Sequence, residues 1–195
     1  MSELVTDAAE LPRLAQSLAL AYDANPLVRW MFAEDLSFPR LEGLFTSLVE
    51  FGLRYGLVYA SADGVGAAIW FPPIGDARFS LDQPAPDVAA DTAEWSSGRR
   101  GAALEALASS RPAEPHFYLD AVGVMPAWRR LGMASALLEP PLAECDAKAI
   151  GAYLENSDPA NTSFYIRHGF EEVDQIVMPE GAPPISSMWR PPKLA

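Results

Sequence analysis

The chain has 195 residues, half of them hydrophobic, and carries 26 acidic against 14 basic side chains, a formal net charge of −12 at pH 7. A negative surplus of this size argues against binding to nucleic acid or to an anionic membrane surface, because both are polyanions. The hydrophobic content excludes global disorder, and the length suits one substantial core. We therefore expect a single domain over residues 1–195.

The single cysteine, Cys145, excludes an internal disulfide, and apolar neighbours at helical spacing predict a buried core position for it. The first ten residues are polar and acidic, so no secretory leader is evident, and no apolar run reaches the roughly 18 residues of a membrane span. We expect a cytoplasmic protein, either a monomer or a homodimer. Twelve arginines beside two lysines suggest bacterial coding.

The first half of the chain predicts two helices followed by a β-hairpin. Apolar residues recur at helical spacing over 11–22 and 38–55, with a short helical turn over 27–32 between them. The apolar runs 57–61 and 65–71 flank an Asp-Gly pair, which is typical of a hairpin. The connection 74–115 is rich in proline, aspartate and alanine. We expect it to lie over the sheet and to contain one helix near 102–109.

The second half predicts the order strand, helix, strand, helix, strand, strand. A β-branched run over 116–124 predicts a buried strand, and a helix should open at Ser135. Pro140 and Pro141 should kink or shorten that helix, because each removes an amide donor. The remaining elements are expected over 151–157, 161–169, 171–178 and 185–189, with Asn161 as N-cap and Gly169 ending the short helix. This pattern predicts a mixed α/β sheet with one parallel crossover.

The turn between the strand 116–124 and the following helix predicts an anion site. Unpaired N–H groups point outward at a helix N-terminus, where the helix dipole also favours negative charge. The small residues Gly132 and Ala134 would let a phosphate oxygen approach the backbone closely. Arg129 and Arg130 place two guanidinium groups at the same turn, and guanidinium forks suit phosphate.

The turn resembles motif A of the GNAT superfamily of N-acetyltransferases, Gln/Arg-x-x-Gly-x-Gly/Ala, which Arg129, Gly132 and Ala134 satisfy. A second stretch, Asn161 to Phe170, resembles motif B of the same superfamily and follows in the expected order. Within the superfamily the chain is similar to the puromycin N-acetyltransferase branch. It departs from the relatives at Arg129-Arg130-Leu131, where Gln-Gly-Lys or Gln-Gly-Arg is more usual, and at Asp120, where a small residue is commoner.

The resemblance implies the GNAT fold, a mixed, mostly antiparallel central sheet with splayed middle strands and flanking helices, and acetyl-CoA (coenzyme A) as cofactor. Strand backbone groups would hold the pantetheine, the arginines and backbone of the turn would hold the phosphates, and motif B would flank the thioester. The implied cofactor residues are Val122, Gly123, Val124, Arg129, Arg130, Leu131, Gly132, Met133, Ala134, Ser135, Asn161 and Phe164.

The resemblance also implies that Tyr165 is the general acid, because a phenol stays protonated at neutral pH and can protonate a thiolate. Tyr165 is alternatively a core aromatic. Glu155 is the first candidate for the general base, followed by Asp120 and Glu34, although each is equally compatible with an ordinary exposed carboxylate. The two histidines, His116 and His168, have no triad or metal-ligand spacing, so we expect no metal.

The expected reaction is acetyl transfer to a primary amine of a small, partly aromatic molecule. Side chains of the first half could enclose such a molecule, although each aromatic one is also a good core residue; the candidates are Tyr22, Trp30, Phe71, Trp95 and Asp120. Two alternatives stay open. One is a non-catalytic regulator that binds acetyl-CoA on the same fold, and the other is an enzyme that transfers a different acyl group.

Overall fold

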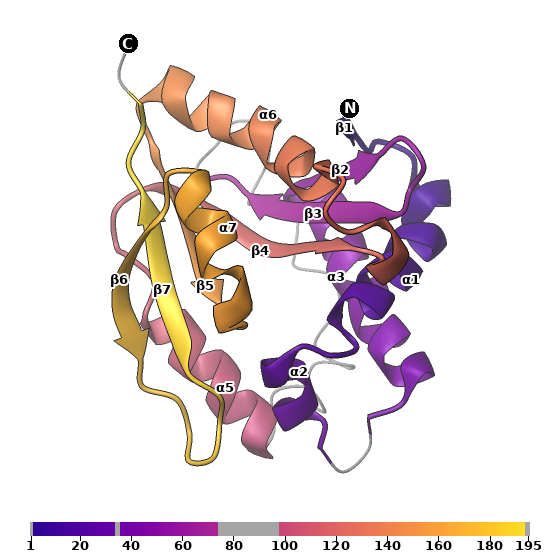
Figure 1. The fold of residues 1–195 in the computed structure, drawn as a ribbon, viewed down its shortest axis with the longest axis vertical. Coiled ribbons are helices and arrows are strands. Elements are labelled where there is room, and N and C mark those ends of the chain that lie inside the picture. Colours follow the sequence, from indigo (N-terminus) through magenta and orange to yellow (C-terminus); the bar gives the residue numbers. More distant parts are fainter. Residues whose placement is uncertain (1, 34–35, 74–97, 194–195) are drawn as a thin grey trace.

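The computed structural model describes residues 2–33, 36–73 and 98–193. Trp95 and Glu34, two of the candidates above, lie outside these residues. Figure 1 shows a central sheet with helices on both faces, built in chain order from β1 (Ser2–Leu4), η1 (Ala8–Glu10), α1 (Leu11–Tyr22), α2 (Pro26–Met31), α3 (Phe38–Tyr55), β2 (Leu57–Ser61), β3 (Gly66–Phe71), α5 (Gly98–Ser109), β4 (His116–Val124), η2 (Pro126–Trp128), α6 (Met133–Lys148), β5 (Gly151–Asn156), η3 (Pro159–Asn161), α7 (Thr162–Arg167), β6 (Glu171–Ile176) and β7 (Ile185–Arg190).

The sheet has seven strands in the order β1-β2-β3-β4-β5-β7-β6. Every neighbouring pair is antiparallel except β4 and β5, which are parallel and joined by α6. The expected mixed, mostly antiparallel sheet with one parallel crossover is therefore confirmed. The expected helices over 11–22 and 38–55 and the strand over 116–124 have the bounds of α1, α3 and β4.

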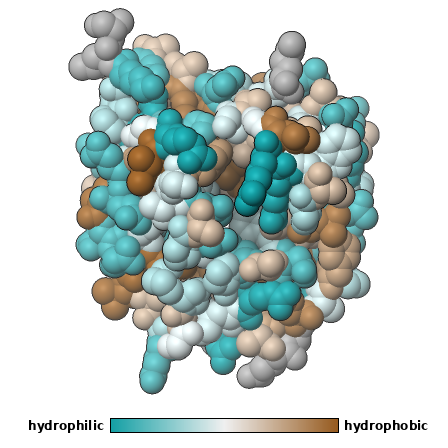
Figure 2. All heavy atoms as spheres, in the orientation of Figure 1, coloured by the Kyte–Doolittle hydropathy of each residue, from teal (hydrophilic) through white to brown (hydrophobic). Residues whose placement is uncertain are grey.

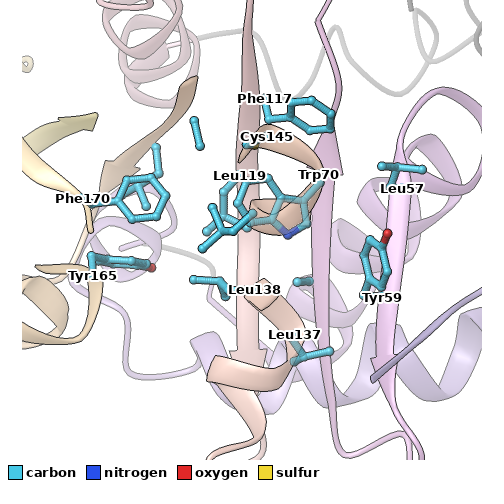
Figure 3. Close-up of a cluster of buried hydrophobic side chains, with 14 of the residues drawn as sticks. Leu57, Tyr59, Trp70, Phe117, Leu119, Leu137, Leu138, Cys145, Tyr165 and Phe170 are labelled. Atoms are coloured by element: carbon cyan, nitrogen blue, oxygen red, sulfur yellow. The ribbon is translucent and has the colours of Figure 1, made fainter. Parts of the chain in front are cut away.

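The sheet buries a separate hydrophobic cluster on each face. On one face α6 packs against β2, β3 and β4, with Trp70 and Phe117 fully buried beneath it (Figure 3). On the other face α1 and α3 pack against each other and against the same strands, around Leu14, Leu18 and Phe45. We call these the α6-side core and the α1-side core. Cys145 is buried in the α6-side core, as expected, and burial raises the pKa of its thiol to about 12.

Two prolines lie inside α6, yet the helix runs from Met133 to Lys148, so they do not end it early, which was one of the two effects expected of them. A proline at position 140 removes the N–H that would bond to the carbonyl of Ala136. That carbonyl instead accepts a hydrogen bond of 2.6 Å from the Ser2 hydroxyl. Ser2 belongs to β1, a strand that the sequence did not predict and that pairs with β2. The unexpected strand thus satisfies a carbonyl that the proline leaves open.

The C-terminal end of α6 is fixed by an ion pair whose arginine is buried and whose aspartate is partly exposed. Arg190 of β7 is only 2% exposed, and its two terminal nitrogens each lie 2.8 Å from a carboxylate oxygen of Asp146. The Arg190 Nε also donates to the carbonyl of His168, which follows α7, at 3.0 Å. One guanidinium therefore joins α6, α7 and β7.

Hydrophilic and hydrophobic side chains are mixed over the face of the molecule drawn in Figure 2.

The Asp146–Arg190 pair predicts a pH-dependent loss of stability. Hydrogen bonds from Arg190 lower the pKa of Asp146, so the pair stabilises the fold above the pKa of an unfolded aspartate and ceases to do so as the pH falls below about 4. We expect Asp146→Asn to lower the free energy of unfolding by about 2 kcal/mol at pH 7, because it leaves a buried guanidinium without its charged partner.

Urea denaturation at several pH values measures this difference, which should shrink between about pH 5 and pH 3. The matched control is Glu144→Gln on the same helix, because the Glu144–Lys148 pair is more exposed and should be worth less than about 1 kcal/mol. Equal effects of the two substitutions at pH 7 would contradict the role given to Asp146.

Candidate active site

The two parallel strands in the middle of the sheet separate soon after they meet. Strand β4 pairs with β5 only over 116–118, opposite 151–153, although β4 continues to Val124 and β5 to Asn156. We call the space between residues 119–124 of β4 and 154–156 of β5 the splay. In Figure 1, α7 lies on the β5 side of this space, and α1 and α2 lie on the other side, beyond β4. The splay leaves backbone groups of both strands without a neighbouring strand.

A β-bulge at Asp120 turns β4 at the beginning of the splay. Ile69 pairs with Ala121 and Trp70 with Leu119, so Asp120 is an extra residue with no partner on β3. Before the bulge, Leu119 packs in the α6-side core, whereas after it Ala121 packs in the α1-side core. A regular strand would have placed both side chains on one face. The bulge therefore reorients the backbone of 121–124 within the splay.

The short helix α7 delivers Tyr165 to the splay. Gly169 has a left-handed backbone with φ of 88° and ends the helix, as expected, and the Phe170 N–H bonds back to the Tyr165 carbonyl at 3.2 Å. Figure 3 shows the ring of Tyr165 extending from α7 towards the sheet, beside Phe170. The side chain is 8% exposed, and this burial raises its pKa well above the ordinary value for tyrosine. Asn161 takes the N-cap position without a side-chain capping bond.

Tyr22, the last residue of α1, reaches the splay from the opposite side. Its ring packs against Phe45 at 4.9 Å, and its hydroxyl accepts a hydrogen bond of 3.2 Å from the N–H of Val122. This N–H therefore points away from β3 and into the splay. Burial, with a smaller contribution from the nearby Asp120, raises the pKa of Tyr22 to about 12, although the hydrogen bond from Val122 opposes the shift. Tyr165 and Tyr22 are electrostatic neighbours, so two protonated phenols meet here.

The carboxyl groups of Asp120 and Glu155 and the guanidinium of Arg111 lie between the two tyrosines and the paired part of β4 and β5. The Arg111 Nε lies 3.3 Å from a carboxylate oxygen of Glu155, and the Arg111 guanidinium lies 4.0 Å from the centre of the Tyr118 ring. Glu155 has a side chain only 6% exposed. Burial raises the pKa of Glu155 and of Asp120, and Arg111 opposes both shifts. The neighbouring Tyr118 side chain also opposes the upward pKa shift of both carboxyl groups.

The turn before α6 is open to a ligand. Gly132 and Arg130 both have left-handed backbones, with φ of 80° and 64°. The first hydrogen bond into the helix joins the Ala136 N–H to the Gly132 carbonyl, so the N–H groups of Met133, Ala134 and Ser135 have no acceptor within α6. A side chain added at Gly132 would meet no atom within 4 Å. The turn thus combines free donors, space and a helix dipole, which suits the phosphates of coenzyme A.

The arginines of this turn differ from each other in the structure. Arg129 donates to the carbonyl of Val124 at 3.3 Å and to that of Ala21 at 2.8 Å, so its guanidinium ties the turn to β4 and α1. Arg130 is exposed, as is Leu131. The sequence assigned both arginines to phosphate without distinguishing them. The structure gives Arg129 backbone partners that no spacing pattern predicted.

The remaining candidate residues contact neighbours around the splay and the α6 turn. A side chain at Gly123 would approach the Ala21 side chain to 2.7 Å, so this glycine allows α1 to pack closely on β4. Phe164 packs between Tyr165 and His168, and Phe71 stacks on Tyr118 with ring centres 6.3 Å apart. Trp30 is half-buried at α2, where Arg99 lies over its ring at 5.2 Å.

Arg111 and Tyr118 are the site residues that sequence reasoning missed. Tyr118 and Asp120 are two apart on one strand, and that alternation was a usable signal for a shared face. Arg111 had no local signal, because it precedes β4 and reaches Glu155 across 44 residues of sequence. The histidines make local bonds, from His116 to the Glu114 carbonyl and from His168 to the Phe164 carbonyl.

In the described part of the chain, no group of three His, Cys, Asp or Glu side chains is arranged to hold a metal ion. No helix of residues 2–33, 36–73 and 98–193 has the length and apolar character needed to cross a bilayer.

Comparisons with known proteins bear on the fold. Residues 101–185, from α5 to the first residue of β7, match the family model described as acetyltransferase (GNAT) domain. A Corynebacterium glutamicum structure described as histone acetyltransferase HPA2 and related acetyltransferase superposes with a TM-score of 0.68 at 23% identity, covering 100% of this chain and 97% of that one.

Two further structures show the same fold at lower identity. Arylalkylamine N-acetyltransferase 2 from Aedes aegypti has a TM-score of 0.66 at 11% identity and covers 99% of both chains. An agmatine N-acetyltransferase has a TM-score of 0.62 at 16% identity, covering 96% of this chain and 98% of that one. The protein therefore has the GNAT fold, and its residues 101–185 match the model of the acetyltransferase (GNAT) domain.

Proposed function

We propose that the protein is an acetyl-CoA-dependent N-acetyltransferase that acts on a primary amine of a small molecule. The observation that carries the proposal is the convergence at the splay of Tyr165 from α7, Tyr22 from α1 and the carboxyl groups of Asp120 and Glu155. These groups come from four elements, and they meet beside a strand backbone that has no neighbouring strand. An acyl transfer to nitrogen needs such a set, because two protons must move while a thioester is held in place.

The proposed cofactor would lie along β4 with its phosphates at the turn before α6. The N–H groups of Met133, Ala134 and Ser135 would bind phosphate oxygens, and exposed Arg130 would add a positive charge. Backbone groups of Val122, Gly123 and Val124 would contact the pantetheine. In the free protein the Val122 N–H is bonded to Tyr22 and the Val124 carbonyl to Arg129, so these side chains would shift or share their partners.

The chain's own residues would handle both protons of the reaction. In such a reaction the amine nitrogen would form a bond to the thioester carbonyl carbon while the carbon–sulfur bond breaks. Tyr165 would protonate the departing thiolate, and Glu155 would accept the proton that the amine loses, directly or through water. Burial raises the pKa of Tyr165, so its hydroxyl stays protonated and keeps a proton to donate. The raised pKa of Glu155 brings this base closer to neutral pH.

The acceptor is proposed to be a small, partly aromatic primary amine. The negative charge of the chain weakly attracts cations, and Phe71 lies beside Tyr118 at the edge of the carboxyl cluster. Tyr22, Trp30 and Asp120 would complete the acceptor side, with Trp95 outside the described residues. The resemblance to the puromycin acetyltransferase branch points the same way, as does a neighbour described as an arylalkylamine N-acetyltransferase.

A release assay for free thiol tests the proposal directly. Acetyl-CoA would be offered with puromycin, an aryl-alkyl amine, a polyamine, an aminoglycoside and a lysine-rich peptide. We expect turnover with puromycin or the aryl-alkyl amine to exceed that with the peptide. Preference for the peptide would contradict a small-molecule acceptor. Tight binding of acetyl-CoA with no turnover of any amine would instead favour the non-catalytic regulator, and turnover with a longer acyl thioester alone would correct the acyl group.

Replacement of Tyr165 by phenylalanine tests the general acid. The ring and its packing remain, whereas the proton is lost, so kcat should fall about 10²-fold with little change in the affinity for acetyl-CoA. The matched control is Tyr59→Phe, because Tyr59 is 9% exposed in the same core but lies on β2 (Figure 3). Wild-type turnover in Tyr165→Phe would show that Tyr165 is only a core aromatic.

Substitution of Gly132 by aspartate tests the phosphate site. The added carboxylate would enter open space beside the free N–H groups and repel the phosphates, so calorimetry should show coenzyme A binding at least about tenfold weaker. The left-handed backbone also strains any side chain here. Gly98→Asp is the matched control, because Gly98 has φ of 59°, no atom within 4 Å of an added side chain, and a position at the start of α5. Equal affinities for coenzyme A in the two folded variants would refute the site.

A further inference from the structure

Arg111 occupies a position that a cationic ligand could take. Its guanidinium lies over the face of the Tyr118 ring at 4.0 Å, and its Nε lies 3.3 Å from the Glu155 carboxylate. An aromatic face beside a carboxylate is an arrangement that attracts ammonium and guanidinium groups. The two partners belong to the floor of the sheet, whereas Arg111 belongs to the connection between α5 and β4. Its side chain is 40% exposed, against 6% for Glu155.

The groups around Glu155 include one more carboxyl group than they include positive charges. Tyr118 and Asp120 face it from β4, Tyr153 lies on its own strand, and its neighbour on β7 is the uncharged Ser187. Arg111 reaches it from the connection before β4. Among the described residues that interact with Glu155, two carboxyl groups therefore face one guanidinium. Asp120 also interacts with Arg111 but makes no ion pair with it within 4 Å.

We propose that Arg111 fills a cation subsite made by the Tyr118 ring and the Glu155 carboxylate, and that it thereby restricts the acceptor to a single positive charge. This inference rests on the proposed function. With Arg111 in place, Asp120 leaves one negative charge for the ammonium of a monoamine. A second ammonium on the acceptor would meet the Arg111 guanidinium, which repels it and covers the ring face that would bind it.

The role follows from position and not from stability alone. Arg111 is the most exposed member of the cluster, so its removal uncovers the subsite without opening the hydrophobic core. Methionine retains the apolar stem on the Tyr118 ring and removes the charge, and lysine retains the charge. If Arg111 only stabilised the fold, its replacement would change kcat/KM by the same factor for acceptors of any charge. A role in selection changes the ratio between acceptors that differ only in charge.

The experiment compares n-butylamine with putrescine, its diamine analogue, as acceptors for wild-type protein, Arg111→Met and Arg111→Lys. We expect Arg111→Met to shift the ratio of kcat/KM towards putrescine by at least about tenfold. Arg111→Lys should keep the wild-type ratio, and added methylguanidinium should return Arg111→Met towards it. Lys148→Ala is the matched control, because it removes one positive charge that lies over the Phe117 ring, at the far end of α6.

An unchanged ratio in Arg111→Met would overturn the proposal, as would an equal shift in Arg111→Lys or in Lys148→Ala. Calorimetric binding of putrescine, without acetyl-CoA, supplies a readout that does not need turnover. Arg111→Met should bind putrescine at least about tenfold more tightly than the wild type does. If the wild type acetylates no amine, the proposed function fails, while this binding measurement still decides whether the subsite exists. If Arg111→Met does not fold, Arg111→Gln takes its place in both measurements.

Discussion

Hydrogen bonding between β4 and β5 stops at Tyr118 and Tyr153, and the candidate site depends on what replaces it. A strand that loses its neighbour presents N–H and carbonyl groups that must find other partners. Here a phenol from α1 accepts from Val122 and a guanidinium from the turn donates to Val124. The bulge at Asp120 turns the same backbone segment. The separation of the two strands thus exposes a row of polar backbone groups inside a largely apolar sheet. The titratable side chains of the candidate site lie along this row.

Helix α6 is fixed to its neighbours along its length, whereas the turn at its N-terminus is open to a ligand. Arg190 fixes the C-terminal half of α6 to α7 and β7, and the Ser2 hydroxyl bonds to the Ala136 carbonyl that Pro140 leaves open. The N-terminal turn of α6 has donors without helical acceptors and no side chain at Gly132. A rigid frame with one open, electropositive turn suits a ligand that carries phosphates at one end and reacts at the other.

Local patterns predicted most of this fold, whereas the contacts that build the site were mostly beyond them. The spacing of apolar residues predicted the bounds of α1, α3 and β4. The preference of glycine for a left-handed backbone predicted that α7 ends before Gly169. Motif spacing brought the α6 turn and Tyr165 to attention. It did not predict β1, which has three residues, or the backbone bonds of Arg129. Nor did it predict Arg111 beside Glu155, because that contact depends on how a connection lies over the sheet and not on any neighbouring residue.

The central claim is that the splay between β4 and β5, together with the turn before α6, is where acetyl-CoA binds. Backbone amide NMR during titration with coenzyme A tests it most directly. We expect the largest shift changes at the amides of Val122, Tyr165, Met133, Ala134 and Ser135, and no comparable change along β6 and β7. Changes centred instead on the amides of Ser2, Ser61, Ala62 and Asp63, which line a pocket that Met133 and Ala136 also border, with the Val122 and Tyr165 amides unmoved at saturation, would contradict it.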